Sequence, residues 1–367
     1  MSNSRVALIH DYLTQYGGAE RVLEELALLF PDAPIFTLLY DERATGGAFA
    51  GRTIYTSFLQ KLPGISSWYR LFPVLMPLAI ERFDLSAYDI VISSSSSFAK
   101  GVLTREDSLH ICYCHTPTRF AWFDYRKIAG HSLYPGWVSL FVPLFLPYIR
   151  LWDRMASARV DVYACNSYYI AEKIKKYYRR TATVIYPPVN TKRFAPEGDG
   201  EYFLVVGRLL PYKRFDIAVS ACTNLSLPLV VVGSGPELAT LKRIAGPTVR
   251  FVGNVSDARL ADLYAHASAL LFPQEEDFGI SAIESMASGR PVIAYRAGGA
   301  CEYVKEGENG IFFEEQTVAG LSAALVRYAT TTFDAQRIRS SALAFDRTRF
   351  QTSMKALISA SLRKKKK

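Results

Sequence analysis

The sequence lacks an apolar run of about 20 residues, the length that a membrane-spanning helix needs. One stretch approaches that length: residues 133–149 carry no charge over 17 positions, but they include Pro135, Pro143 and Pro147. Proline removes a backbone donor and disturbs the interior of a helix. We therefore expect a buried or interfacial helix in this stretch and no membrane span.

Cysteine is also scarce. The chain has five cysteines, an odd number, and they lie in apolar surroundings. Such cysteines are typical of reduced thiols in a cytosol rather than of a disulfide framework. The first residues, MSNSRVALIHDYL, do not have the pattern of a secretory signal, because Arg5 and Asp11 bring charges into them. These features favour a cytoplasmic protein.

Signatures of a metal site are missing as well. Cys112, Cys114 and His115 lie close together in the sequence, but no second pair of ligands is evident for the four that zinc takes. Buried thiols are the simpler interpretation of the two cysteines. The sequence also has no well-placed DxD-like motif, the acidic pattern that would bind a metal ion. We predict that the protein uses no metal and no other cofactor.

Positive charge is in excess, with 43 Lys and Arg against 34 Asp and Glu and a net charge of +9. Residues 1–195 hold 22 basic and 16 acidic side chains, whereas residues 196–362 hold 16 and 18, and the last five residues are RKKKK. A basic half and a basic tail suit an anionic membrane surface or a nucleic acid. An ordinary solvated surface with a frayed tail is the third interpretation.

Aromatic residues accompany the bases of the first half. Residues 66–83 combine Trp68, Tyr69 and Phe72 with arginines, and residues 173–180 read KIKKYYRR. Bases attract anionic headgroups, and aromatic side chains favour the membrane interface. We therefore expect peripheral attachment at the inner face of the cell membrane. The bases are not interleaved with an RNA-binding motif, so we expect no nucleic-acid partner, and a basic nucleic-acid-binding protein stays the alternative of another class.

The length and the pattern of apolar segments indicate two domains. Short apolar runs alternate with amphipathic patterns, which predicts parallel sheets covered on both faces. A proline-rich break at 186–200 separates two such series. The fold class is therefore α/β, with two doubly wound Rossmann-like domains that face a cleft. We place an N-terminal domain at 1–195, a C-terminal domain at 196–345, and a helix with a basic tail at 346–367.

The predicted strands end where ligands of doubly wound sheets bind. In the first domain they are 5–10, 89–95, 110–116 and 161–166, with helices at 18–30 and 168–178. In the second domain they are 203–207, 229–233, 249–253, 269–273 and 291–295, with helices at 214–222, 236–245, 256–267 and 280–288.

Charged residues follow two predicted strands of the second domain. Arg208 and Lys213 could neutralise a diphosphate, since Arg grips two oxygens and Lys acts as a point charge. Glu276 lies in a loop before a predicted helix, and Glu284 lies more than one turn into that helix. Gly279 marks the helix N-terminus, whose unpaired N–H groups attract a phosphate. Each feature taken alone would also fit ordinary surface residues.

Together these features follow a fixed order: GRLLPYK (207–213), VGSGP (232–236), FVGNVSD (251–257), EDFGISAIE (276–284) and SGRPVIAYRAGG (288–299). That order resembles the retaining, nucleotide-sugar-dependent glycosyltransferases of the GT-B fold, of the family 4, group 1 type. The first half resembles bacterial mannosyltransferases that build surface polysaccharides on lipid carriers. The segments that carry this likeness are HDYLTQYGGAERV (10–22), CYCHTPTRFAW (112–122) and VIYPPVNTKRF (184–194).

The resemblance implies transfer of a hexose, first of all mannose from GDP-mannose, to a hydroxyl of a lipid-linked or oligosaccharide acceptor with retention of configuration. It implies that the C-terminal helix returns to the first domain. The catalytic residues that it implies are His115, Glu276, Arg208 and Lys213. The substrate-binding residues that it implies are Gly17, Gly18, Arg208, Lys213, Phe278, Gly279, Ile280 and Glu284.

Within these roles Glu276 would orient the sugar and Glu284 would bind the ribose. His115 would contact the donor sugar, although a satisfied core histidine is the other interpretation of that residue. A sugar-nucleotide epimerase shares the fold and is the alternative within the enzymes. A phosphorylase would need a lysine for pyridoxal phosphate and a much longer chain.

Overall fold

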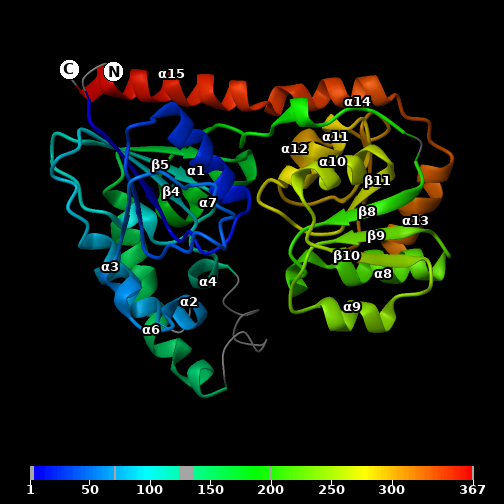
Figure 1. Ribbon diagram of the computed structural model, residues 1–367, viewed down its shortest axis with the longest axis horizontal. Coiled ribbons are helices and arrows are strands. Elements are labelled where there is room, and N and C mark those ends of the chain that lie inside the picture. The colour runs from blue at the N-terminus through cyan, green and yellow to red at the C-terminus, as the bar shows by residue number, and fades with distance from the viewer. Residues whose placement is uncertain (1–3, 70–71, 124–135, 199, 366–367) are drawn as a thin grey trace. The chain divides into compact units, whose positions relative to one another are not determined.

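The computed structural model describes residues 4–69, 72–123, 136–198 and 200–365 (Figure 1). The chain forms two compact units. Unit 1 comprises Met1–Pro188 and Phe350–Lys367, and unit 2 comprises Val189–Arg349. The end of the chain therefore belongs to the same unit as its first half.

Unit 1 is built on a parallel sheet. Within the described residues this sheet has seven strands in the order β3-β2-β1-β4-β5-β6-β7. The strands are β1 (Val6–His10), β2 (Ile35–Thr37), β3 (Ile54–Thr56), β4 (Ile90–Ser95), β5 (Leu109–Cys114), β6 (Val162–Cys165) and β7 (Ala182–Val184). Every residue of β4 and β5 is buried, as expected for central parallel strands that are covered on both faces.

Helices cover this sheet. They include α1 (Gly18–Leu29), α2 (Ile65–Trp68), α3 (Met76–Glu81), α4 (Arg119–Trp122), α6 (Gly136–Ala158) and α7 (Tyr168–Tyr178). The buried face of α1, with Val22, Leu23 and Leu26, packs in one core with Ile35 of β2 and Ile92 of β4. Two residues of α6, Leu146 and Ile149, belong to a separate core of the same unit.

The C-terminal helix α15 (Arg347–Lys365) contributes to the core of unit 1. Phe350, Met354 and Ile358 recur every four residues, so they share one face of the helix, and they are buried in the core that contains α1. Gln351 Nε2 donates to Glu25 Oε2 of α1 at 2.7 Å. Each buried side chain of this size contributes about 1.5–3 kcal/mol of transfer free energy. The predicted return of this helix to the first domain is confirmed.

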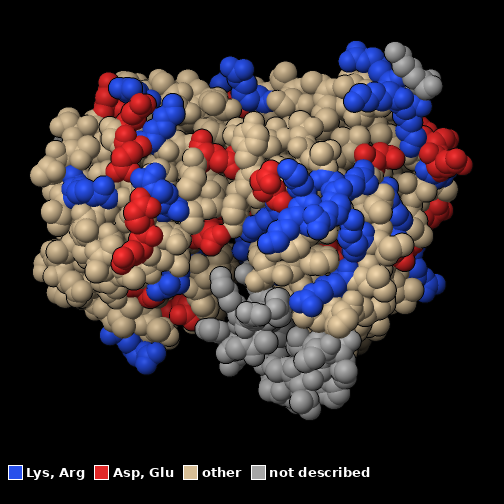
Figure 2. Space-filling view, turned by 180° about the vertical axis from the view of Figure 1, so that it is seen from behind, with Lys and Arg blue, Asp and Glu red and all other residues tan. Residues whose placement is uncertain are grey.

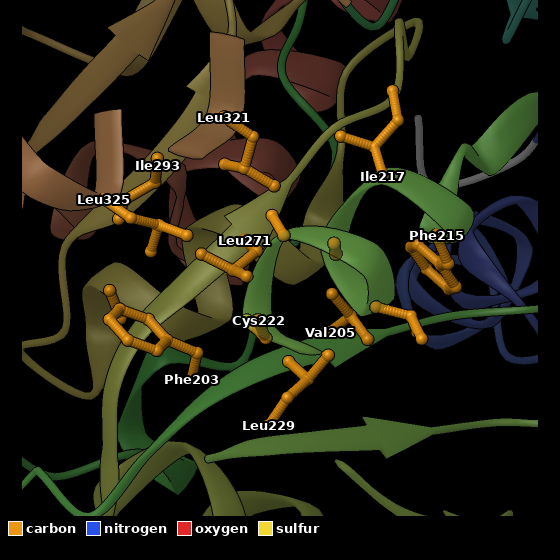
Figure 3. Packing of buried hydrophobic residues seen from close by; sticks show 14 of the residues in the cluster. Phe203, Val205, Phe215, Ile217, Cys222, Leu229, Leu271, Ile293, Leu321 and Leu325 are labelled. Atoms are coloured by element: carbon orange, nitrogen blue, oxygen red, sulfur yellow. The ribbon is translucent and has the colours of Figure 1, made fainter. Parts of the chain in front are cut away.

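Unit 2 also holds a parallel sheet, with six strands within the described residues in the order β10-β9-β8-β11-β12-β13. The strands are β8 (Tyr202–Val206), β9 (Leu229–Val232), β10 (Val249–Gly253), β11 (Ala267–Phe272), β12 (Val292–Tyr295) and β13 (Gly310–Phe313). The helices include α8 (Phe215–Asn224), α9 (Leu238–Ile244), α10 (Asp257–Ala265), α11 (Ile280–Ala287), α12 (Ala300–Tyr303), α13 (Val318–Ala329) and α14 (Ala335–Ala342). Figure 3 shows how Val205 and Leu271 of the strands meet Cys222 of α8 and Leu325 of α13 in its core.

The two doubly wound sheets confirm the predicted fold class, and every predicted strand has a counterpart. The sequence missed β2, β3 and β7, which have three residues each, and the four-residue β13, because so few residues give almost no periodicity. The stretch 133–149 lies partly outside the described residues, and from residue 136 it forms part of α6. None of the helices described is both long and apolar enough to cross a membrane.

The strand order reverses beside the first strand of each unit. β1 has β2 on one side and β4 on the other, and β8 has β9 on one side and β11 on the other. Connections from the two neighbouring strands therefore leave in opposite directions, and doubly wound sheets bind ligands at the carboxyl ends of the strands at that point. The residues that follow β1, β4, β8 and β11 are the first candidates for a functional site.

A buried histidine makes the stability of unit 1 depend on pH. His110 in β5 hydrogen-bonds Ser93 Oγ through Nε2 at 2.9 Å, and burial lowers the pKa of His110 to about 4. The unfolded chain takes up this proton near the ordinary histidine pKa of ~6.5. The stability contribution is therefore complete above that pH and falls as the pH drops toward 4, by ~1–3 kcal/mol between pH 7.5 and 5.

Urea unfolding followed by tryptophan fluorescence measures this loss, because all four tryptophans (68, 122, 137 and 152) lie in the sequence of unit 1. The variant His110→Asn has no imidazole to protonate at this position. We expect it to lose less stability than the wild type between the two pH values, whatever its stability at pH 7.5. An equal loss in both proteins would contradict the assignment.

Candidate functional site

Two loops at the carboxyl ends of β8 and β9 lie in backbone contact. Leu209 N donates to Ser234 O at 2.9 Å, and Gly207 N donates to Val232 O at 3.1 Å. Gly233 has φ of 127°, and a Cβ at this position would overlap the carbonyl oxygen of Gly207. Glycine is therefore required here by its backbone conformation and by the close approach of the second loop.

Lys213 and Glu276 form an ion pair at this end of the sheet. Lys213 closes a short 3-10 turn after β8, Glu276 follows β11, and Lys213 Nζ donates to Glu276 Oε1. The two side chains are 14% and 16% exposed, so the pair is largely shielded from water. Arg208, at the start of the same loop, is exposed. The structure thus brings together a base and an acid for which separate roles were predicted.

Helix α11 begins next to this pair. Gly279 precedes the helix with φ of 98°, and a Cβ there would lie 2.5 Å from a ring carbon of Phe272 and 2.8 Å from the Tyr303 hydroxyl. The loop is fixed from behind, because Tyr303 donates its hydroxyl hydrogen to Phe278 O at 2.7 Å. The N–H groups that open a helix lack intrahelical acceptors, and they favour an anion. Ile280 is the first residue of the helix.

The Phe278 side chain has a different place from the one expected of a ligand-binding residue. It is 3% exposed, and its ring packs against Tyr303 at 5.4 Å and Phe345 at 5.6 Å between centroids. Its aromatic ring therefore stabilises the loop from inside the unit. Because the side chain is buried, Phe278 could contact a ligand only through its backbone N–H or carbonyl group.

Glu284 lies inside unit 2 and has partners of its own. It is 3% exposed, it accepts from the Tyr264 hydroxyl at 3.0 Å, and it accepts from an Arg193 guanidinium nitrogen at 3.4 Å. Arg193 also pairs with Asp257. The sequence did not predict that Arg193 would be a partner of Glu284, because 91 residues separate the two.

In unit 1 the glycine pair precedes α1. Gly18 is the first residue of the helix, and Gly17 N donates to Glu20 Oε2 at 2.8 Å, which caps the helix through its third residue. Gly17 has an extended backbone with φ of −144°, and a Cβ there would lie 3.2 Å from Glu20 Oε2. A side chain would therefore crowd the cap.

His115 directly follows β5 and is 9% exposed. Its Nε2 lies 2.7 Å from Ser94 Oγ, which in turn lies 3.1 Å from His10 Nδ1. His10 Nε2 lies 3.7 Å from Glu20 Oε1. Burial, and next the charge of His10, lower the pKa of His115 to about 3, so this imidazole is neutral at physiological pH.

Of these four residues the sequence identified His115 alone. His10 and Ser94 follow the same rule that singled out His115, since they stand at the ends of β1 and β4. Glu20 could have been recognised as the third residue of a helix that begins at the second of two glycines. Burial alone would raise the pKa of Glu20, but hydrogen bonding to His10 and the charge of His10 outweigh this and lower it.

No group of three or more metal-ligating side chains is found in the described residues. Cys112 and Cys114 are fully buried in β5, as the sequence predicted for these thiols. Burial raises the pKa of the Cys114 thiol well above its usual range. The Nε2 atom of His115 is already hydrogen-bonded to Ser94 Oγ.

The predicted site residues therefore fall into two groups. Lys213, Glu276 and the start of α11 lie at the carboxyl end of the sheet of unit 2. Gly17 and His115 are joined through Glu20, His10 and Ser94 in unit 1.

Family models match almost the whole chain. Residues 16–193 match the model described as Glycosyltransferase Family 4, and residues 189–342 match the model described as Glycosyl transferases group 1. The chain belongs to the family 4, group 1 glycosyltransferases. The resemblance that the sequence motifs indicated is thereby confirmed.

Several curated proteins are similar to parts of this family member. An uncharacterized glycosyltransferase of Methanocaldococcus jannaschii is 30% identical over 45% of this chain and 49% of its own length. A D-rhamnosyltransferase of Pseudomonas aeruginosa is 28% identical over 47% of this chain and 49% of its own. A GDP-mannose-dependent alpha-(1-6)-phosphatidylinositol monomannoside mannosyltransferase of Mycobacterium tuberculosis is 27% identical over 53% and 66%. The similarity thus spans from about half to two thirds of these relatives.

Solved structures of similar fold extend over nearly the full glycosyltransferase chain. The Anabaena HepE structure in complex with UDP and glucose has a TM-score of 0.70 at 17% identity, and it covers 97% of this chain and 100% of that one. A lipopolysaccharide outer core galactosyltransferase has a TM-score of 0.67 at 16% identity, with 97% and 99% covered. At these identities the likeness establishes the fold, which is GT-B.

Proposed function

We propose that this glycosyltransferase moves a hexose from a nucleoside diphosphate sugar to an acceptor hydroxyl with retention of configuration. The observation that carries the proposal is the convergence of Lys213, Glu276 and the N-terminus of α11 at the strand-order reversal of unit 2. Positive charge, a carboxylate and unpaired N–H groups are what a sugar diphosphate requires of its binding site.

In the proposed reaction the bond between the anomeric carbon and the diphosphate oxygen breaks, and the electron pair stays on the diphosphate. The acceptor oxygen bonds to the anomeric carbon from the same face, and its proton passes to the departing phosphate oxygen. Arg208, Lys213 and the N–H groups at Gly279 and Ile280 stabilise the leaving diphosphate. Such stabilisation by fixed donors and cations commonly supplies a large share of rate enhancement.

The carboxylates and the histidine have separate parts in this proposal. Glu276 accepts from hydroxyls of the sugar, and Lys213 moves from Glu276 toward the diphosphate when the donor binds. Glu284 binds the ribose with the carboxylate that Tyr264 and Arg193 hold in place. His115 contacts the donor sugar. The Gly17-Gly18 turn lets backbone approach the diphosphate.

For the donor we propose GDP-mannose, and for the acceptor a lipid-linked saccharide in the synthesis of a cell-surface polysaccharide. The similarity to the mycobacterial mannosyltransferase and to the D-rhamnosyltransferase supports a sugar of this class. Because the HepE structure contains UDP, UDP sugars are tested as donors beside GDP-mannose.

Turnover of sugar nucleotides tests the proposal. Purified protein is first screened by thermal shift with GDP, UDP, ADP and dTDP, and the matching sugar nucleotides are then assayed for acceptor-dependent release of the nucleotide. We expect Glu276→Gln to lower kcat at least about 100-fold while the Kd for the nucleotide changes little, because its proposed partner is the sugar. Lys213→Gln is expected to weaken nucleotide binding by ~1–3 kcal/mol.

The exposed neighbour Glu275 provides the matched control, and Glu275→Gln should stay near wild-type activity. Activity is expected to persist in EDTA, because cationic side chains neutralise the diphosphate. Sugar conversion without an acceptor would favour the epimerase instead. A metal requirement restored by Mg²⁺, or equal loss of nucleotide affinity in the Glu276 and Lys213 variants, would contradict the assigned roles.

We further propose that unit 1 attaches peripherally to the anionic inner face of the cell membrane. Figure 2 shows Lys and Arg gathered on one face of unit 1. Lys175, Lys176 and Arg179 at the end of α7 are exposed, and Lys173 Nζ lies 4.0 Å from the centre of the Tyr169 ring. These bases supply the attraction to acidic headgroups.

Apolar side chains of unit 1 are only partly available to lipid. Tyr69 and Met76 of the aromatic stretch 66–83 are buried in the core, so these two side chains do not reach the surface. Phe72 and Leu78 of the same stretch are exposed. On α6 an exposed stripe is formed by Tyr148, Leu151 and Met155, which recur every three or four residues.

Vesicle co-sedimentation tests the attachment. The triple variant Lys175→Gln, Lys176→Gln, Arg179→Asn should bind anionic vesicles about a hundredfold more weakly, at ~1 kcal/mol per base. Arg179 has a φ of 55°, which lies in the left-handed region. Asparagine replaces it because asparagine tolerates this backbone conformation better than most residues. Arg180 is left intact, since it donates to the carbonyl oxygen of Val160 at 2.6 Å.

The control removes the same charge from exposed bases of unit 2, with Lys242→Gln, Arg243→Gln and Arg250→Gln. It should bind vesicles as the wild type does. Binding of the wild type should rise with anionic lipid and fall with salt. Equal losses in both triple variants, or binding that ignores lipid charge, would refute attachment through α7.

A further inference from the structure

Four buried polar side chains form a continuous chain in unit 1, at the strand-order reversal. The chain runs from Glu20 to His10, Ser94 and His115, with separations of 3.7, 3.1 and 2.7 Å between successive polar atoms. His10 is 2% exposed, Glu20 is 3% exposed and Ser94 is fully buried. Polar groups so buried are costly unless they are matched donor to acceptor.

The position of each proton in this chain follows from Glu20. An N–H of His10 is favoured on Nε2, because that nitrogen faces the carboxylate at 3.7 Å and a lone pair there would be repelled. In neutral His10 the other nitrogen, Nδ1, is then an acceptor. The Ser94 hydroxyl donates to it, which leaves Ser94 Oγ as the acceptor of a proton on His115 Nε2.

The last ring is held firmly in this arrangement. His115 N donates to Ser95 O at 2.8 Å, and Asn166 Nδ2 donates to His115 O at 2.9 Å. The Tyr113 ring meets the imidazole edge to face at 5.2 Å between centroids. Throughout the part of the chain that the structure describes, His115 Nδ1 has no hydrogen-bond partner.

We propose that His10, oriented by Glu20, fixes the tautomer of His115 through Ser94, so that His115 carries its proton on Nε2 and presents Nδ1 as a bare acceptor. His10, Glu20 and Ser94 are thus positioning residues, and His115 is the group that accepts a hydrogen bond from a hydroxyl of the sugar. The identity of that hydroxyl donor rests on the proposed function. The tautomer itself is a property of the free protein.

The neutral state of His115 agrees with this arrangement. Its pKa is lowered to about 3, chiefly by burial, so the ring does not become a cation at physiological pH. A doubly protonated His10 would reverse every donor in the chain. The charge state of His10 therefore has to be observed together with the tautomer of His115.

Long-range proton–nitrogen NMR spectra of the full chain, labelled with ¹⁵N-histidine, show which ring nitrogen carries the proton. The chain has five histidines, and single His→Gln variants assign their signals. Spectra are recorded at a pH where His10 Nδ1 is seen to be unprotonated. We expect wild-type His115 to be the Nε2–H tautomer. A wild-type His115 with its proton on Nδ1 would overturn the proposal without any variant.

Variants at Ser94 test the connection. Ser94→Ala should release His115 into a mixture of tautomers and lower kcat about tenfold with little change in KM for the nucleotide sugar. Ser94→Thr keeps the hydroxyl and should keep the wild-type tautomer. His10→Asn keeps an amide oxygen as the acceptor for Ser94, and it should retain the tautomer that His10→Leu loses.

Ser93→Ala is the matched control. It lies on the same strand and breaks another buried serine–histidine bond, the one to His110, but successive residues of a strand point to opposite faces. It should change neither kcat nor the tautomer of His115. Equal tautomer shifts in Ser93→Ala and Ser94→Ala would overturn the proposal. A shift in Ser94→Ala alone, in a protein that turns over no sugar nucleotide, would support the tautomer assignment and refute the proposed function.

Discussion

The reversal of strand order in each sheet is the constraint on which the candidate site depends. A parallel strand delivers its following loop to the same edge as its neighbours, and at the reversal the connections leave to opposite sides. In unit 1 this edge places His10 beside Ser94, with His115 one strand further. In unit 2 it places the loop after β8, with Lys213, beside the loop after β11, with Glu276.

Buried polar contacts hold these loops in position. The Asp11 carboxylate accepts the backbone N–H groups of four successive residues, 96–99, at 2.6–2.9 Å, so it fixes the turn after β4. Lys100 pairs with Asp153 at 2.5 Å, and Asp153 also accepts from Thr118 Oγ1 at 2.7 Å, three residues after His115. Removing one partner of such a buried pair costs about 3–5 kcal/mol, because the other charge stays buried.

Whether a buried side chain in unit 1 is charged depends on whether a group of opposite charge lies beside it. Burial alone would lower the pKa of Lys100, but Asp153 outweighs it and raises the pKa, so this base remains charged beside its acid. Among the residues that the structure describes, no carboxylate lies at hydrogen-bond distance from the His115 ring, and burial keeps this imidazole neutral. One unit thus holds a permanent structural ion pair and, nearby, a neutral histidine that ends a hydrogen-bond chain.

The sequence predicted what depends on local pattern. Continuous apolar runs such as 203–206 and 229–232 specify buried parallel strands, and glycines such as Gly279 mark turns that no other residue fits. The order of the motifs was sufficient to identify the family.

What the sequence did not predict is which side chains meet. Lys213 and Glu276 are 63 residues apart, and His10 and Ser94 are 84 apart. Such contacts depend on how strands are ordered in a sheet, which periodicity does not specify. Exposure is also a tertiary property: Phe278 has the position of a ligand contact in the motif, but its ring is buried.

The central claim is that the strand-end loops of unit 2 bind the diphosphate of a nucleotide. Hydrogen–deuterium exchange of the intact protein, with and without saturating GDP, UDP, ADP or dTDP, tests it most directly. With the nucleotide that binds, we predict slower exchange in peptides that cover 207–213 and 276–284, and unchanged exchange in α13. Protection confined to other segments, or none with any of the four nucleotides, would contradict the account.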